Sequence, residues 1–516
     1  MNAEFNFLVL VSVTRLFVYI VKESCMLSTT LYSYSSYIGA RLNRLDPNDT
    51  PFYDYSQPRI KSLLLNNYDW ILSTYKDGRM RDAVLDNVLK TIICRTPYLG
   101  YDEFECPECG DWILIYRHCH SRFCTRCGVK LQRKLAAQAE VMCVNKKHRH
   151  IVFTIPEQYR ELFRSDRKLL DLLFIASRNT LMKVFNKNIF DKAKRKKQKN
   201  SKKFCGDKDN IYLMRNYKDI NIFGSIATLH TFGRDLKWNP HIHALVPELV
   251  YNTKTEKCED FHHLNFASLR KTWQYEVNRL LKEYYHDSDD TKLKSRINSL
   301  INQSYKNYDS GFYVYAKYQG DEFDEDDTIN NAKKKSKEFS KNVGACVSYM
   351  MRYAGRPAMA ESRIITYDKD SDKVSWWYDD HTTGDRITVN ETGRELLGKM
   401  FIHIPDKNFR MVRYYGFYSN KEKDLLYKIH SQLGNIIKAS LIKQEKKKEL
   451  KRKLNQLKFR TLCADTFNRD ILKCRCGGYY EYKDTYNPER KRSDRQYMLD
   501  CVADMRRLRP PGIYED

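Results

Sequence analysis

Residues 223–246 read FGSIATLHTF, GRDLKWNP and HIHALV, and this stretch decides the fold that the sequence predicts. The first and third pieces are apolar runs of strand length, from Phe223 to Phe232 and from His241 to Val246. The middle piece carries the Gly and Pro residues that are typical of a turn. The two runs are therefore predicted to pair as an antiparallel β-hairpin.

Three histidines of this hairpin are candidates for a metal site. In a strand, residues i and i+2 share one face, so His241 and His243 are expected to project together while the isoleucine between them points into the core. Such a pair can bind a divalent ion and leave positions open for a phosphate oxygen. His230 is the expected third ligand, provided that the hairpin register pairs it with His241 or His243. Asp235 and Glu248 are the alternatives.

A cysteine-rich module precedes the hairpin. CPEC at 106–109 and CTRC at 124–127 are two CxxC knuckles with fourteen residues between them. Two knuckles supply the four thiolates that tetrahedral zinc prefers, and a closed four-ligand site leaves no position for a substrate. The module is expected to bind structural Zn²⁺, which would stabilise a fold that contacts DNA. The predicted ligands are Cys106, Cys109, Cys124 and Cys127, with Cys94 and Cys119 as additional ligands.

A pair of tyrosines lies in the motif VSYMMRYAGRP, which begins at Val347. Its apolar residues recur at helical spacing, and the Gly and Pro near its end predict that the helix stops there. Tyr349 and Tyr353 are four residues apart, so their side chains are neighbours on the helix, about 6 Å apart. Both can reach one phosphate, and an adjacent metal ion can stabilise the transition state while a base takes the phenolic proton.

The charge of the chain indicates its partner. It has 91 Lys and Arg residues against 65 Asp and Glu residues, a formal net charge of +26. An excess this large attracts polyanions, and nucleic acid is the leading one. The predicted DNA-contacting residues are Arg122, Arg126, Arg234, Lys237 and Arg352. Six of the 15 cysteines fall between Cys94 and Cys127, which favours metal binding in a reducing cytoplasm over a disulfide scaffold.

Four regions are expected along the chain. They are an N-terminal extension (1–60), a zinc-binding module (61–140), a domain with the histidine and tyrosine motifs (141–425) and a basic helical region (426–516). The predicted fold class is α+β. Helices are expected at 82–93, 169–185 and 266–285, and a strand at 150–156. The apolar run 5–21 is interrupted by Arg15, and we expect no membrane anchor.

The motifs together resemble a known family. CRTPYLGYDEFECPECG, CHSRFCTRCG, HRHIVFTIP, LHTFGRDLKWNPHIHALV and YMMRYAGRPAMAESRI occur in this order over about residues 80–420. The set is similar to the two-tyrosine rolling-circle transposases of the insertion sequence ninety-one family. The closing CRCGG, from Cys474, resembles only half of a zinc knuckle.

The resemblance implies that residues 141–425 form an HUH nuclease domain, which is an antiparallel sheet flanked by helices. The name HUH denotes two histidines around a hydrophobic residue. It implies that His241 and His243 bind Mg²⁺ or Mn²⁺ and that Tyr349 and Tyr353 attack DNA. Cleavage of one strand would leave a 5′-phosphotyrosyl enzyme and a free 3′-OH, and the second tyrosine would permit strand exchange. The implied substrate is a single-stranded or hairpin element end and its target, in a cytoplasmic, nucleoid-associated protein without a small-molecule substrate.

Two other functions are compatible with the same motifs. A plasmid or phage replication initiator nicks its origin with the same histidines and tyrosines. A non-catalytic, zinc-dependent DNA-binding regulator would use the tyrosines for packing and bury the histidines. The regulator predicts that Tyr349→Phe and Tyr353→Phe leave every activity intact.

Overall fold

The computed structural model describes residues 60–187, 220–261, 264–318, 347, 350–352, 355, 357–380, 383–435, 470–488 and 494–507. Residues 1–59, which make up nearly all of the expected N-terminal extension, lie outside the described residues, and so do Tyr349 and Tyr353. The chain divides into two compact units. Unit 1 comprises Met1–Gln57, Ile93–His118 and Tyr480–Asp516, and unit 2 comprises Pro58–Ile92 and Cys119–Tyr479.

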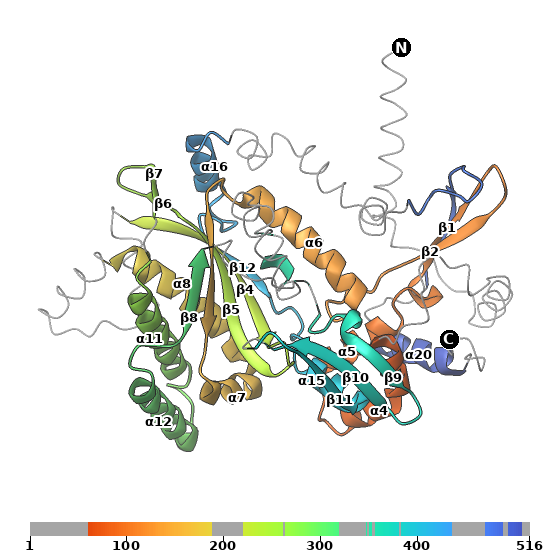
Figure 1. Cartoon of the computed structure of the whole chain (residues 1–516), viewed down its shortest axis with the longest axis horizontal. Coiled ribbons are helices and arrows are strands. Elements are labelled where there is room, and N and C mark those ends of the chain that lie inside the picture. Colours follow the sequence, from red (N-terminus) through yellow and green to blue (C-terminus); the bar gives the residue numbers. More distant parts are fainter. Residues whose placement is uncertain are drawn as a thin grey trace, which may run out of the picture. The chain divides into compact units, whose positions relative to one another are not determined.

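A seven-stranded sheet forms the centre of unit 2 (Figure 1). Its strand order is β7-β6-β4-β5-β3-β8, with β12 also paired to β4, and every pair is antiparallel. The strands are β3 (His148–Thr154), β4 (Asn221–Phe232), β5 (Trp238–Pro247), β6 (Leu249–Asn252), β7 (Lys257–Asp260), β8 (Val314–Tyr318) and β12 (Val412–Gly416). The predicted strand at 150–156 and the predicted hairpin are confirmed as β3 and as β4 with β5.

The hairpin register places the histidines on one face. His230 lies directly opposite His241, and Thr228 lies opposite His243. The turn between the strands closes with a hydrogen bond from the Gly233 amide to the Lys237 carbonyl. The predicted register of His230 with His241 is therefore confirmed. Ile242 points to the opposite face and is fully buried there.

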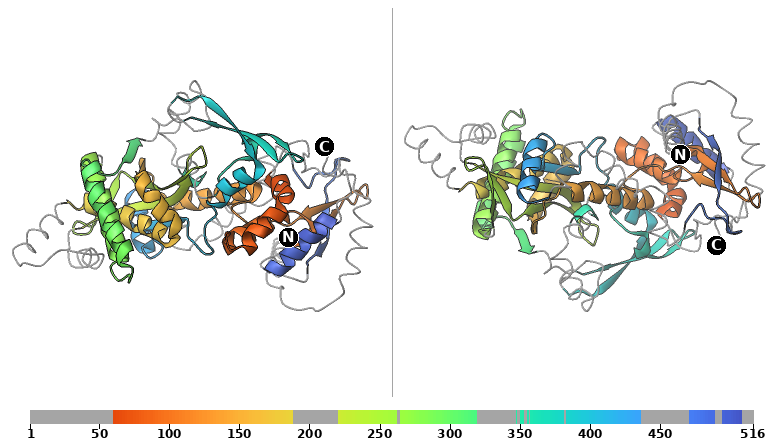
Figure 2. Two further views of the ribbon diagram at one scale, coloured as in Figure 1. Left: turned by 90° about the horizontal axis from the view of Figure 1, so that it is seen from below. Right: turned by 90° about the horizontal axis from the view of Figure 1, so that it is seen from above.

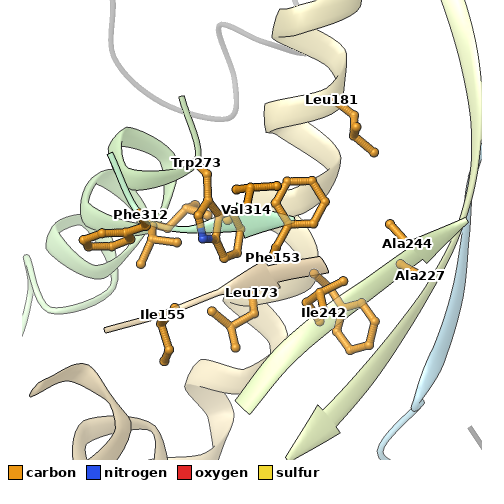
Figure 3. Close-up of a cluster of buried hydrophobic side chains, with 14 of the residues drawn as sticks. Phe153, Ile155, Leu173, Leu181, Ala227, Ile242, Ala244, Trp273, Phe312 and Val314 are labelled. Atoms are coloured by element: carbon orange, nitrogen blue, oxygen red, sulfur yellow. The ribbon is translucent and has the colours of Figure 1, made fainter. Parts of the chain in front are cut away.

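Helices cover that opposite face and build the larger core of unit 2 with it. They are α7 (Glu157–Ser165), α8 (Leu170–Phe185), α11 (Phe266–Tyr284) and α12 (Thr291–Asn307), and the green helices α11 and α12 lie at one end of the unit (Figure 2). Figure 3 shows Ile242 of β5 near Leu173 of α8, with Phe153 of β3 next to Trp273 of α11. The predicted helices at 169–185 and 266–285 are confirmed.

Local sequence explains where two of these helices begin. The Asn265 side chain accepts a hydrogen bond from the Ser268 amide at 2.8 Å, and the Asp290 side chain accepts one from Leu293 at 2.9 Å. Short polar side chains at the N-cap satisfy amides that have no partner within the helix. The two caps therefore set the starts of α11 and α12.

Helix α6 (Thr125–Met142) packs on the histidine face of the sheet. Ala136 and Ala139 of α6 belong to a buried cluster with Ile226 of β4 and Leu245 of β5. Both sheet residues share the face of the three histidines, because each lies an even number of positions along its strand from one of them. The cluster also includes the helical residues Val347, Met350 and Met351.

Unit 2 also contains a smaller three-stranded sheet and further helices. The sheet has the order β11-β10-β9, and Trp376 of β10 is buried in it. The strands are β9 (Ile364–Asp368), β10 (Lys373–Asp379) and β11 (Arg386–Thr392), and the helices are α3 (Ile60–Asn66), α4 (Tyr68–Lys76), α5 (Asp82–Ile92), α15 (Gly393–Phe401) and α16 (Lys423–Gln432). The predicted helix at 82–93 is confirmed as α5.

Unit 1 joins distant parts of the chain. Its sheet has the order β13-β1-β2, with β1 (Tyr101–Glu105), β2 (Trp112–Tyr116) and β13 (Glu481–Tyr486), and it is accompanied by helix α20 (Arg495–Arg507). The Tyr101 and Tyr486 rings stack with centroids 5.3 Å apart, and the Tyr480 hydroxyl donates to the Asp111 carboxylate at 2.5 Å. The region 426–516 was expected to be helical, yet it contributes this strand, because its aromatic residues pack across β1.

Among the described helices, none combines the length and the apolar character that crossing a bilayer requires.

Candidate functional site

The three hairpin histidines form one cluster of potential metal ligands. One ring nitrogen from each of His230, His241 and His243 lies within 4.8 Å of the others. All three side chains are buried, with 5–8% of their surface exposed. The cluster follows from local sequence, because β4 and β5 each place alternate residues on this face.

Hydrogen bonds orient two of the rings. The His241 Nδ1 lies 2.6 Å from the carbonyl oxygen of Asn239. A carbonyl only accepts, so this nitrogen carries the proton and the lone pair of His241 is on Nε2. That Nε2 lies 3.2 Å from the Nδ1 of His230. The Nδ1 of His243 lies 2.7 Å from the Nε2 of His150 on the neighbouring strand.

Burial keeps the three imidazoles neutral. It lowers the pKa of His241 from 6.5 to about 4, with a further contribution from the Arg160 charge and an opposing one from the Asn239 hydrogen bond. Burial, and then the neighbouring histidines, hold the pKa values of His230 and His243 well below 6.5. Neutral imidazole is the form that binds a metal ion, so the cluster is in its ligand form at pH 7.

Two arginines add positive charge beside the cluster. The Arg122 guanidinium contributes to the low pKa of His230, and Arg160 contributes to that of His241. Burial lowers the pKa of Arg122 to about 10, which leaves it charged at pH 7. Fixed cations next to potential metal ligands suit a bound phosphate, because arginine binds phosphate oxygens through a planar fork of donors.

The acidic alternatives for a third ligand have other partners. The Glu248 carboxylate is buried and accepts from Arg149 at 2.8 Å. Asp235 forms an ion pair with Lys237 at 3.2 Å. His230 is therefore the residue that the structure brings to His241 and His243.

The other predicted DNA-contacting residues are dispersed over unit 2. Arg234 is half-buried and donates to the Asp379 carbonyl at 3.2 Å, and Lys237 is exposed in the hairpin turn. Arg126 lies in the first turn of α6, and Arg352 is half-buried in the helical segment that follows Met350. Their contact with DNA remains a prediction.

The helical segment that carries the tyrosine motif packs on the histidine face. Val347, Met350 and Met351 are fully buried there, in the cluster that includes Ile226 and Leu245 of the sheet. Tyr349 and Tyr353 themselves lie outside the described residues. The structure therefore places the backbone neighbours of the predicted nucleophiles on the face that holds the histidines.

Two glycines set the contact between this segment and α6. A Cβ atom at Gly355 would lie 2.4 Å from the Gln132 amide nitrogen, and one at Gly128 would lie 2.7 Å from the Gly355 carbonyl oxygen. Real Cβ atoms do not approach other atoms so closely. The two backbones can therefore touch only because both positions lack a side chain.

Three cysteines of unit 2 form a thiol cluster at the start of α6. The sulfur atoms of Cys119, Cys124 and Cys127 lie within 4.8 Å of one another, and those of Cys119 and Cys127 are 3.6 Å apart. Zn–S bonds of about 2.3 Å in a tetrahedral site separate the sulfurs by about 3.8 Å. The Ser121 amide also donates to the Cys119 sulfur at 3.4 Å, so the cluster fits Zn²⁺ well.

The other predicted zinc ligands belong to unit 1. Cys106 and Cys109 follow β1 and bring their sulfurs within 4.8 Å of each other, and Cys94 is buried near the start of the unit. The knuckles at 106–109 and 124–127 therefore belong to separate groups of thiols. The prediction that both knuckles supply one four-thiolate site was wrong, because knuckle spacing shows which two thiols meet locally but not which distant cysteines complete the site. That all six cysteines bind zinc remains a prediction.

The predicted site residues leave out two further features of the structure. The first is His150 beside His243, although the alternation in HRHIVFT (His148–Thr154) is visible as a strand pattern. The second is Cys474 and Cys476 in unit 2, whose sulfurs also lie within 4.8 Å of each other. The spacing CRC is shorter than a CxxC knuckle and CRCGG resembles only half of one, so neither cysteine is among the predicted ligands.

Comparisons with known proteins agree with this geometry. Residues 65–155 match the family described as "Transposase zinc-binding domain", and residues 224–425 match the family described as "Putative transposase". The "Transposase for insertion sequence element IS801" of Pseudomonas savastanoi pv. phaseolicola is 26% identical over 373 residues, covering 71% of this chain and 78% of its own.

A second relative is the "Putative transposase y4qJ" of Sinorhizobium fredii (strain NBRC 101917 / NGR234). It is 22% identical over 348 residues, covering 64% of this chain and 73% of its own. No solved structure matches the chain.

The two matched regions and the thiol cluster define a zinc-binding transposase, a protein of DNA transposition encoded by a mobile element. The chain belongs to the insertion sequence ninety-one family of transposases, with its zinc-binding domain on the N-terminal side.

Proposed function

We propose that this transposase is an HUH endonuclease that nicks and rejoins single-stranded DNA at insertion-sequence ends, through a 5′-phosphotyrosine intermediate, in rolling-circle transposition. One observation carries the proposal. The donor atoms of His230, His241 and His243 converge within 4.8 Å, on the same sheet face against which Val347, Met350 and Met351 pack. These three residues belong to the segment that bears Tyr349 and Tyr353.

The donor set fits a catalytic divalent ion. Three neutral imidazoles supply three ligands and leave further coordination positions for phosphate oxygens and water. Mg²⁺ or Mn²⁺ held by His230, His241 and His243 would polarise the scissile phosphate. The low pKa values of the histidines support this role, because protons do not compete for the ligand atoms near neutral pH.

Tyr349 and Tyr353 are the proposed nucleophiles. In the first cleavage, the phenolic oxygen of one tyrosine loses its proton to a base and bonds to phosphorus. The bond from phosphorus to the 3′-oxygen breaks, and that oxygen leaves as a 3′-hydroxyl after gaining a proton. Attack by a 3′-hydroxyl on the phosphotyrosine reverses the step and joins two strands. The energy of the phosphodiester bond is conserved, so no nucleotide cofactor is required.

Positive charge supports DNA as the substrate of this site. Arg122 and Arg160 lie close enough to the histidines to lower their pKa values, and either guanidinium can stabilise negative charge on a phosphate in the transition state. The net charge of +26 adds a sequence-independent attraction to nucleic acid. A single strand is proposed because a flexible backbone can bring one phosphate into a buried cluster, whereas a paired duplex is stiff.

The cell compartment proposed for this activity is the cytoplasm, at the nucleoid. The thiols of Cys119, Cys124 and Cys127 cluster as zinc ligands do, and thiols that bind zinc persist where the environment is reducing.

A covalent-adduct assay tests the proposed function. Purified protein is incubated with a labelled single-stranded oligonucleotide carrying a candidate element end, with Mn²⁺ or with chelator, and is analysed on a denaturing gel. The expected result is an adduct that requires metal, persists in Tyr349→Phe or Tyr353→Phe, and is absent from the double variant. Equal cleavage of relaxed duplex DNA would contradict the single-stranded substrate.

The same assay separates the two rival functions. Zinc-dependent DNA binding with no adduct on any candidate end would favour a non-catalytic regulator. Adduct formation at a plasmid or phage origin but not at element ends would favour a replication initiator.

A further inference from the structure

We propose that His150 is a positioning residue, which fixes the ring of His243 in the tautomer and orientation that bind the divalent ion. The proposal rests on the proposed metal centre and adds to it a residue that is not itself a ligand. His150 lies on β3, two positions before Val152, which is the direct cross-strand partner of His243. The two histidines are therefore diagonal neighbours on one sheet face.

The contact between the two rings is close and buried. The Nε2 of His150 lies 2.7 Å from the Nδ1 of His243. The ring centroids are 5.0 Å apart and the planes differ by 9°. His150 is 3% exposed and His243 is 5% exposed, so bulk water does not compete for this hydrogen bond.

One proton must lie between the two nitrogens, because a distance of 2.7 Å joins a donor to an acceptor. If the Nδ1 of His243 carries the proton and donates to His150, the lone pair of His243 is on Nε2. If His150 donates instead, the Nε2 of His243 is protonated and cannot bind a metal ion. The metal-binding state therefore requires His150 to accept.

His241 shows the same arrangement with a different acceptor. Its Nδ1 donates to the Asn239 carbonyl, an oxygen that can never reverse the bond. The acceptor proposed for the Nδ1 of His243 is a side chain, that of His150. A mutation of His150 can therefore remove the hydrogen bond that orients the His243 ring. Partners of this kind typically change metal affinity by 10- to 100-fold when removed.

The chain offers a matched control on the same strand. His148 is 2% exposed and shares the sheet face of His150, since the two are separated by one residue. Its Nε2 bonds to the Tyr418 hydroxyl at 2.9 Å, and its Nδ1 bonds to the Lys146 carbonyl at 2.8 Å. It is thus a buried, doubly bonded histidine outside the cluster of ligands.

The experiment measures Mn²⁺ affinity of the full chain by electron paramagnetic resonance, without DNA. His150→Leu removes the acceptor, His150→Gln keeps an acceptor near the position of Nε2, and His148→Leu is the control. We expect His150→Leu to bind Mn²⁺ about 10- to 100-fold more weakly, and His150→Gln and His148→Leu to remain within a few-fold of wild type. Circular dichroism establishes that each variant is folded, and His150→Phe replaces His150→Leu if the latter is not.

The outcomes distinguish an error in the role of His150 from an error in the proposed metal centre. If the wild type binds Mn²⁺ and the folded His150→Leu or His150→Phe variant binds it equally well, the role of His150 is wrong while the metal centre stands. An equal loss in His148→Leu would assign the effect to general packing and would also overturn the role. If the wild type does not bind Mn²⁺, the proposed metal centre falls, and the role of His150 falls with it.

Discussion

Gly355 lies so close to helix α6 that a Cβ atom added to it would be 2.4 Å from the amide nitrogen of Gln132. Gly355 is helical, as are Val347 and Met350–Arg352, and Tyr349 and Tyr353 precede it in the sequence. Helix α6 begins beside the Cys119, Cys124 and Cys127 thiols. One helix thus links the thiol cluster to the tyrosine segment through direct backbone contact.

Gly355→Ala is expected to displace the tyrosine segment and to slow adduct formation. The new methyl group would meet backbone atoms of α6, which cannot rotate away as a flexible side chain can. A shift of about 1 Å at a reacting group can cost about 100-fold in rate. The measurement is the rate of adduct formation with Mn²⁺ and a single-stranded element end.

Gly398→Ala is the control for this substitution. Gly398 lies within α15, and a Cβ atom there would meet nothing within 4 Å. Alanine is the better helix former by about 1 kcal/mol, so this variant should be at least as stable as the wild type and react at the same rate. Unchanged kinetics in Gly355→Ala would disprove the positional role of the glycine contact.

Loss of zinc from the Cys119, Cys124 and Cys127 cluster is expected to impair DNA cleavage as well as folding of the module. Cys124→Ser with Cys127→Ser removes two thiolates at the start of α6, and the first turn of that helix loses its anchor. We expect about one Zn²⁺ fewer per chain by elemental analysis, together with weaker adduct formation. Cys258→Ser, a cysteine outside every thiol cluster of the described residues, should keep both the zinc and the activity.

Loss of zinc with full cleavage activity would contradict this prediction. A double variant that lacks the Zn²⁺ ion and still forms the adduct at the wild-type rate would separate the zinc cluster from the cleavage step.

Mn²⁺ binding is expected to persist in mildly acidic solution. At pH 5.5, a histidine with a pKa of 6.5 is about 90% protonated, whereas one with a pKa of about 4 is only about 3% protonated. The pKa of His241 is about 4, and those of His230 and His243 are also held low by burial. Affinity should therefore change by less than about tenfold between pH 7.5 and 5.5, as titrations followed by electron paramagnetic resonance can establish. A loss of three orders of magnitude would mean that the histidines titrate as ordinary exposed ones.

His403 is expected to make the folded state sensitive to acid. Its Nε2 donates to the Leu236 carbonyl at 2.9 Å, and its Nδ1 lies 3.1 Å from the Thr231 hydroxyl. Burial lowers its pKa to about 4, with an opposing effect from the Leu236 hydrogen bond and a further lowering by Arg167. Because the unfolded chain takes up a proton near pH 6.5 and the folded chain does so only near pH 4, stability is present above pH 6.5 and is lost as the pH falls toward 4.

The test compares His403→Gln with wild type by chemical unfolding at several pH values. Between pH 6.5 and 4 the free energy of unfolding should fall by about 3 kcal/mol less in the variant, the value that corresponds to the two pKa values. His286→Gln changes an exposed histidine and should leave the pH dependence as in the wild type. Parallel curves for His403→Gln and wild type would contradict the account of His403.

The hairpin, the three histidines and the two knuckles were all accessible from the sequence. Strand alternation placed His241 and His243 on one face, and the turn residues 233–240 limited the register that pairs His230 with His241. Helices α5, α8 and α11 followed from apolar periodicity. The C-terminal strand β13 was missed, because its pairing with β1 joins distant residues such as Asp102 and Thr485, which are 383 positions apart.

By itself, the sequence determined which side chains can do chemistry, because strand and helix periods place residues i and i+2, or i and i+4, together without any distant contact. It determined the histidine pair, the spacing of Tyr349 and Tyr353, and the CxxC knuckles. Only the tertiary structure decided that His150 bonds to His243 and that Gly355 lies against α6. Those contacts join residues that are 93 and 223 positions apart, and packing alone determines which distant elements meet.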